Sequence, residues 1–166
     1  MQPFKTLVGL AAPLPRANLD TDVIIRIERL TTVPQNELGQ YAFEAIRYLA
    51  DGTPDPEFLP ARPEFNGASI LVSGANFGCG SSRESAVWAL LSMGYRCVIA
   101  PSFGSIFYNN CFQNGVLPLT LDEAQVNELT TLARQAKSFT VDLERQVIEV
   151  DGRSWNFAID ALRRDM

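Results

Sequence analysis

The sequence predicts one α/β domain over residues 1–166, with a mainly parallel sheet core and an antiparallel addition near the C-terminal end. Three observations lead to this fold class. Short apolar segments alternate with helical ones through the middle of the chain, the pattern of a β-α-β-α-β wind. The later part changes to alternating apolar and polar residues around an Asp-Gly turn, which indicates antiparallel strands. The composition, 46% hydrophobic and 20% charged over 166 residues, is typical of one globular domain with a full core.

The first part of the chain is predicted to hold a strand, a helix and a long loop. Thr6–Leu10 is a short apolar segment that suits a strand, and two prolines soon after it predict a turn. Apolar residues recur every three or four positions over Glu37–Ala50, with Gly52 placed as a C-terminal cap, so a helix is expected there. Four prolines within residues 51–67 exclude a helix or an interior strand from that stretch.

The remainder of the chain alternates strands and helices before the antiparallel addition. Parallel strands are expected at residues 68–73, 97–100 and 116–121, and helices at 83–93, 105–113 and from Asp122 or Thr120 to 135. Antiparallel strands are expected at residues 139–143 and 147–150 and around Trp155 and Phe157, with Asp151-Gly152 as the turn.

Charge and hydropathy limit the partners. Fourteen basic against nineteen acidic residues give a net charge of −5, and no basic cluster stands out, so nucleic acid is not an expected partner. No apolar run approaches the roughly 20 residues that a membrane helix needs. The N-terminal stretch lacks the pattern of a signal peptide. We therefore expect a cytoplasmic protein that binds neither nucleic acid nor membrane.

The chain contains no histidine, which excludes Ser-His-Asp and Cys-His catalysis and any imidazole acid-base group of its own. Cys79, Cys97 and Cys111 are odd in number and widely spaced. They form no CxxC motif for a metal or a redox pair, and we expect structural thiols in a reducing compartment.

The segment most suited to chemistry is the glycine-rich loop of residues 73–84, SGANFGCGSSRE. It lies between a predicted buried strand and a predicted helix. Glycines let the backbone approach a ligand, the helix start favours an anion, and Arg83 is suited to clamp a carboxylate or phosphate. Neither GxGxxG nor the Walker pattern fits, since Arg83 stands where the last glycine belongs and the lysine is missing. A second interpretation is a capping box, with Ser81 as N-cap and Glu84 returning to its backbone.

The loop sequence Asn76 to Glu84, followed by Trp88-Ala89-Leu90, resembles the signature of the aconitase swivel domain, most closely that of the small subunits of 3-isopropylmalate dehydratase. The resemblance extends over three further segments, residues 18–25, 100–110 and 114–119. It implies a three-layer β/β/α swivelling domain that docks on a separate large subunit. The two subunits would isomerise 2-isopropylmalate to 3-isopropylmalate by dehydration and rehydration in leucine biosynthesis. It also implies a [4Fe-4S] cluster that the large subunit holds and this chain does not.

By position, the resemblance assigns Ser81 as the base that takes the substrate proton. Arg83 would hold a substrate carboxylate of a small dicarboxylate, Ser82 would assist, and Asp22 would be an active-site acid that orients other groups. A serine needs N–H donors and a nearby cation to act as a base at neutral pH. The alternatives are a turn aspartate at position 22 and a surface ion pair at Arg83.

The resemblance also implies that residues 26–34 form a specificity loop. We expect Leu30 and Val33 to face an alkyl substituent of the substrate, and Arg26 and Arg29 to point to solvent or to the partner subunit. Thr31 belongs to the same loop. This arrangement would favour alkyl malates over tricarboxylates. A guanidinium buried against the alkyl group would have no carboxylate partner and would weaken binding of an alkyl malate.

The chain departs from the family pattern at two positions, Ser85, where members commonly carry His, and Arg26, where they commonly carry Pro. Other functions therefore stay open. One is the small subunit of a related hydro-lyase acting on a citramalate or dimethylmalate type of acid. The others are a non-catalytic interaction domain and a glycine-loop module that binds a phosphorylated ligand.

Overall fold

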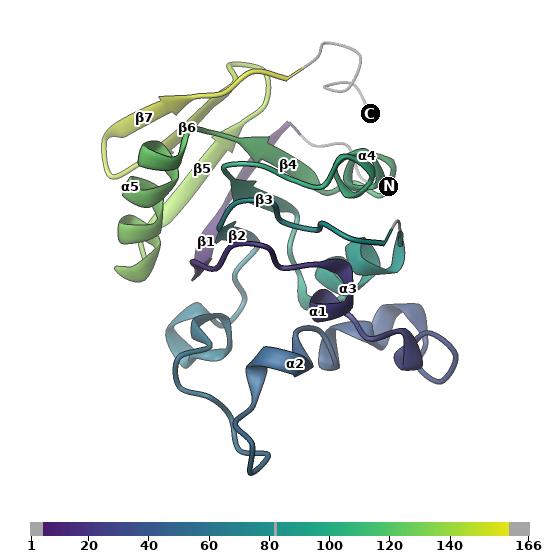
Figure 1. Ribbon diagram of the computed structural model, residues 1–166. Helices are drawn as coiled ribbons and strands as arrows, with labels where there is room; N and C mark the ends of the chain where they lie inside the picture. Colours follow the sequence, from purple (N-terminus) through teal and green to yellow (C-terminus); the bar gives the residue numbers. More distant parts are fainter. Residues whose placement is uncertain (1–4, 82, 160–166) are drawn as a thin grey trace.

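The computed structural model describes residues 5–81 and 83–159 and shows a seven-stranded sheet in the order β4-β3-β2-β1-β5-β6-β7 (Figure 1). Neighbouring strands among the first four are parallel, and the pairs from β1–β5 onward are antiparallel. The predicted α/β class, parallel core and antiparallel addition are confirmed. The strands are β1 (Thr6–Leu14), β2 (Ile70–Ser73), β3 (Cys97–Ala100), β4 (Leu117–Thr120), β5 (Ser138–Asp142), β6 (Val147–Val150) and β7 (Arg153–Asn156).

The long helices follow the strands as the sequence predicts. Helix α5 begins with a capping box. The Asp122 side chain accepts from the Gln125 backbone N–H, and the Gln125 side chain accepts from the Asp122 backbone N–H. Asp122 rather than Thr120 therefore starts the helix. The α-helices are α1 (Thr21–Ile24), α2 (Glu44–Arg47), α3 (Ser85–Met93), α4 (Ser105–Gln113) and α5 (Glu123–Arg134); 3-10 turns are η1 (Ile27–Arg29), η2 (Gln35–Gln40), η3 (Leu59–Ala61) and η4 (Pro63–Phe65).

Two hydrophobic cores lie on opposite faces of the parallel strands. Successive strand residues point to opposite faces, so Leu71 and Val98 enter the core under α3. Ile70 and Ile99 enter the core that also contains the apolar side of α5 and the antiparallel strands. The four strand residues are fully buried, which explains their continuous apolar sequence.

Strand β1 joins the two parts of the sheet. Its first half pairs antiparallel with β5 and its second half pairs parallel with β2. The strand is therefore longer than the predicted Thr6–Leu10 and runs through Pro13, which aligns with Val72. Proline has no backbone N–H to donate to a neighbouring strand. It is tolerated here because only every second residue of a strand bonds to a given parallel neighbour.

The predicted helix at Glu37–Ala50 is wrong. The structure has η2 and α2 there, separated by residues 41–43, and the last of these, Phe43, has a φ of 60°. Phe43 is fully buried, its ring packs 5.7 Å from that of Phe58, and its backbone N–H donates to Ile24 at 2.8 Å. These tertiary contacts stabilise the left-handed backbone conformation of Phe43 and interrupt the helix that the sequence pattern predicts. Tertiary contacts commonly override helix propensity in this way.

Within the described residues, none of the helices combines the length and the apolar character needed to cross a membrane.

The burial of two thiols gives a prediction about labelling. Cys97 and Cys111 are fully buried and burial raises the pKa of both, whereas Cys79 is half-buried in the glycine loop. A raised pKa leaves less thiolate at pH 8, and thiolate is the form that reacts. We expect iodoacetamide to label the folded chain once, at Cys79, and the urea-unfolded chain three times, counted by mass spectrometry. Rapid labelling of Cys97 or Cys111 in the folded chain would contradict the packing described here.

Candidate active site

The site is built where three parallel strands end. The carboxyl ends of β1, β2 and β3 lead into residues 15–20, 74–84 and 101–104, and these segments carry α1, α3 and α4. Strand ends of parallel sheets are the usual position of ligand sites in α/β folds. The glycine-rich loop occupies the central of these three positions.

Backbone hydrogen bonds tie the β1 and β2 segments together. Gly78 N–H donates to Leu19 at 2.8 Å, and Thr21 N–H donates to Cys79 at 3.0 Å. The fully buried Thr21 also donates its hydroxyl to the Ser81 carbonyl at 3.1 Å. Thr21 therefore fixes the backbone of Ser81, a role that the sequence analysis missed because only the tertiary structure brings positions 21 and 81 together.

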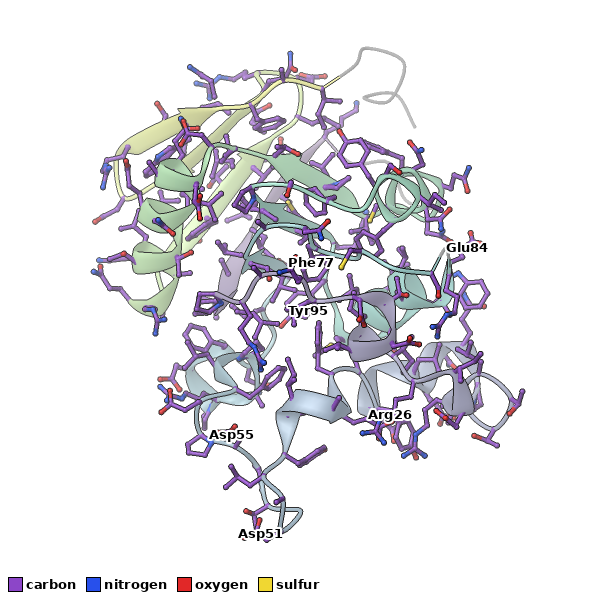
Figure 2. The ribbon with its side chains drawn as sticks, viewed as in Figure 1. Arg26, Asp51, Asp55, Phe77, Glu84 and Tyr95 are labelled. Carbon is purple, nitrogen blue, oxygen red and sulfur yellow. The ribbon has the colours of Figure 1, made fainter. Side chains whose placement is uncertain are left out.

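The β3 segment supports the glycine loop from its other side. Phe77 exchanges backbone bonds with Ser102 and Gly104 at 3.0 and 2.9 Å, and its buried ring packs edge-on against Phe107 with centroids 5.5 Å apart. Phe77 lies at the centre of the molecule in Figure 2. A Cβ on Gly78, whose φ is +75°, would lie 2.3 Å from the Phe107 ring, so glycine is required there.

Asp22 and Arg83, 61 residues apart in sequence, meet as an ion pair between Oδ1 and Nη2. The Asp22 side chain is 65% exposed and that of Arg83 is 18% exposed. The Nη1 atom of Arg83 is buried and finds no hydrogen-bond partner among the described residues. A buried guanidinium N–H without an acceptor is unfavourable. The Arg83 side chain keeps 18% of its surface exposed, and a guanidinium is suited to bind a carboxylate.

Ser81 is exposed beside this pair. Hydrogen bonds from Thr21 Oγ1 and Arg83 N–H, the latter at 2.9 Å, hold its carbonyl oxygen. The capping-box interpretation is wrong, because α3 begins at Ser85 with Glu84 as N-cap and without a side-chain capping bond. Glu84 instead accepts from Asn114 at 2.8 Å. Ser82 lies outside the described residues.

The predicted specificity loop lies directly after α1 and includes η1. Figure 2 shows Arg26 below the start of α3 that Glu84 marks. The Arg29 guanidinium does not point free into solvent: it donates to both oxygens of Glu44, at 3.0 and 2.9 Å, and lies 4.1 Å above the Tyr41 ring. Arg26 is exposed, 3.7 Å from the same carboxylate of Glu44.

The apolar residues of this loop differ in how far they are exposed. Leu30 and Val33 are half-buried and pack against the core under α3, while Thr31 is exposed. The exposed aliphatic residue of the loop is Ile27, at 58%. The sequence analysis missed Ile27, although an isoleucine between Arg26 and Glu28, both charged, is a signal that could have been weighed.

The three thiols of this chain lie on different elements. A [4Fe-4S] cluster needs about three or four thiolates gathered in space, whereas Cys79 lies in the loop, Cys97 in β3 and Cys111 in α4. Among residues 5–81 and 83–159, no three His, Cys, Asp or Glu side chains are grouped to hold a metal ion.

Comparisons with known proteins identify the family of the chain. The family model described as the aconitase C-terminal domain matches residues 1–124. Proteins called 3-isopropylmalate dehydratase small subunit from Rhodospirillum rubrum and Paramagnetospirillum magneticum are each 50% identical over 99% of this chain, covering 81% and 83% of the relatives.

A solved structure shows the same fold. The crystal structure of 3-isopropylmalate dehydratase from Methanocaldococcus jannaschii superposes with a TM-score of 0.72 and 28% identity, covering 96% of this chain and 86% of that one. The resemblance that the loop signature indicated is thus confirmed over nearly the whole length. The chain belongs to the aconitase C-terminal domain family and, within it, to the small subunits of 3-isopropylmalate dehydratase.

Proposed function

We propose that this chain is the small subunit of a cytoplasmic hydro-lyase that isomerises 2-isopropylmalate to 3-isopropylmalate in leucine biosynthesis. The proposal rests on one observation: Ser81, Asp22 and Arg83 lie together on loops that are hydrogen-bonded to one another. The Arg83 guanidinium bonds Asp22 through Nη2, and its Nη1 has no partner among the described residues. The relatives with this name, 50% identical, supply the reaction. Their designation as small subunits supports a large subunit as partner.

In the proposed reaction, the Arg83 guanidinium holds a carboxylate of the small dicarboxylate substrate, while Asp22 orients the guanidinium through Nη2. Ser81 Oγ takes the proton from the substrate carbon, and the hydroxyl leaves from the neighbouring carbon as the double bond forms. Rehydration adds the proton and the hydroxyl back with their positions exchanged. Ser82 is proposed to assist in binding the carboxylate.

The remaining groups are proposed to come from the large subunit, which would hold the [4Fe-4S] cluster. This division is supported by the composition of the chain, since it has no histidine and its three thiols lie on a loop, a strand and a helix. A site shared between two chains also accounts for the exposure of Asp22 and Ser81 on an open surface.

Reconstitution tests the function directly. We expect the chain, mixed with the large subunit from its own source and loaded with iron and sulfide under anaerobic conditions, to convert 2-isopropylmalate, followed by the absorbance of the unsaturated intermediate. The chain alone is expected to be inactive and to bind no stoichiometric iron. Stoichiometric iron on the isolated chain, or an assembled complex without activity, would contradict the proposal.

Replacement of the base is the second test. In the assembled enzyme, Ser81→Ala is expected to lower kcat by about 10²- to 10⁴-fold, the usual contribution of a positioned acid-base group. Because Ser81 makes no capping bond, the melting temperature of the chain should stay the same. Ser154→Ala, at an exposed serine on β7, is the matched control and should leave both quantities unchanged. Normal turnover with Ser81→Ala would assign the base to another residue.

Substrate choice is proposed to depend on the loop of residues 26–34. With Arg29 paired twice to Glu44, the guanidinium is already neutralised, so a third carboxylate on the substrate is not favoured. Ile27 supplies exposed apolar surface, while Leu30 and Val33 support the loop from the core. This arrangement favours alkyl malates, with citramalate or dimethylmalate types as the alternative substrates.

The specificity proposal predicts a selective loss. Ile27→Ala is expected to lower kcat/KM for 2-isopropylmalate by roughly tenfold or more, since removed methylenes in a substrate pocket have effects of that size, and to affect citramalate less. Val8→Ala, at a 63% exposed position on β1, is the control. Steady-state kinetics of the assembled enzyme measure both. Equal losses for the two substrates, or a preference for citrate that disappears in Arg26→Ala, would overturn this assignment.

A further inference from the structure

The side-chain amide of Asn114 joins the end of α4 to the start of α3. Asn114 is the C-cap of α4. Its Nδ2 donates to Glu84 Oε1 and to the Asn110 carbonyl, both at 2.8 Å, and its Oδ1 accepts from Trp88 Nε1 at 3.2 Å. Both N–H groups and the carbonyl of the amide are therefore used.

The chemistry of the neighbours fixes the orientation of this amide. An indole nitrogen can only donate and an ionised carboxylate can only accept. With the amide turned over, its N–H groups would face the Trp88 donor and its oxygen would face Glu84. Asn114 is thus matched to both partners in one orientation.

Glu84 and Trp88 occupy the part of α3 nearest the proposed site. Glu84 follows Arg83 directly and is the N-cap of α3, and Trp88 lies one turn later on the same face of the helix. Figure 2 shows Glu84 at the start of α3, on the side of the molecule where α4 lies. One side chain of α4 therefore anchors two consecutive turns of the segment that carries Arg83.

Helix α4 supports the loop at both of its ends. At its N-terminal end, Gly104 and Phe107 lie against Gly78, which fixes the first part of the glycine loop. At its C-terminal end, Asn114 fixes the last part. Ser81 and Arg83 lie in between, so their positions depend on the distance between these two supports.

We propose that Asn114 is a positioning residue for the isomerisation, acting through Glu84 and Trp88 to place Arg83 and Ser81. The inference rests on the proposed function. Misplacement of reacting groups by about 1 Å is enough to lower a rate roughly a hundredfold, so the amide is expected to affect catalysis without touching the substrate.

The test exchanges donor and acceptor between the two side chains in the assembled enzyme. N114D places a carboxylate opposite that of Glu84, and their repulsion should lower kcat/KM for 2-isopropylmalate by about a hundredfold, with a raised KM and a lowered kcat. E84Q alone keeps an acceptor for the Asn114 amide and should change kcat/KM by less than about fivefold.

The double variant E84Q/N114D is the discriminating measurement. The amide introduced by E84Q donates to the carboxylate introduced by N114D. We therefore expect kcat/KM of the double variant to be at least about tenfold higher than that of N114D alone. Recovery should be partial, because the Asn110 carbonyl still lacks its donor. N127D, which adds the same charge at an exposed position on α5, is the matched control and should behave as the unaltered enzyme.

The outcomes separate this inference from the proposed function. An assembled enzyme that is inactive without any substitution contradicts the proposed function itself. An active enzyme in which N114D turns over normally, or in which E84Q/N114D is no better than N114D, contradicts the role of Asn114 alone. If N114D does not assemble, Trp88→Phe removes the bond from Trp88 Nε1 to Asn114 and keeps a smaller aromatic ring. It should lower kcat/KM about fivefold, and unchanged kinetics would overturn the inference.

Discussion

The proposed site depends on the backbone hydrogen bonds between the segments that follow β1 and β2. Gly78 to Leu19 and Thr21 to Cys79 are main-chain bonds, at 2.8 and 3.0 Å. They require the two chains to approach closely, and this approach is what the glycines permit. A Cβ on Gly74, for example, would lie 2.4 Å from the carbonyl oxygen of Arg16. Without this contact, Asp22 and Arg83 would not meet.

The consequence for chemistry is a half-built site. Asp22 engages one nitrogen of Arg83 and leaves the other buried without an acceptor among the described residues. Ser81 is held by its carbonyl, and its side chain lies on an exposed surface. An unsatisfied donor, an exposed hydroxyl and the lack of histidine are all unfavourable or ineffective in an isolated chain. They make physical sense when a second protein and a carboxylate substrate complete the arrangement.

The local sequence pattern was sufficient to predict the helices and strands that bury one or two faces. The boundaries of β3 and α4 match those predicted, and Asp122, one of the two predicted starts, is the N-cap of α5. It failed where tertiary contacts override the pattern, as at Phe43 in the predicted helix. The Ser81-x-x-Glu84 box failed for a similar reason, because Glu84 is taken by Asn114. Thr21 and the proposed role of Ile27 were missed because burial and exposure are not specified by spacing alone.

The most direct test of the account is a structure of the assembled enzyme with 2-isopropylmalate or a stable analogue bound. We expect a substrate carboxylate within about 3 Å of the Arg83 guanidinium, the distance of a charge-assisted hydrogen bond, with Asp22 still on Nη2 and Ser81 Oγ facing the carbon that loses its proton. A substrate bound away from Arg83, or an Arg83 whose two outer nitrogens both stay on residues of its own chain, would contradict the central claim.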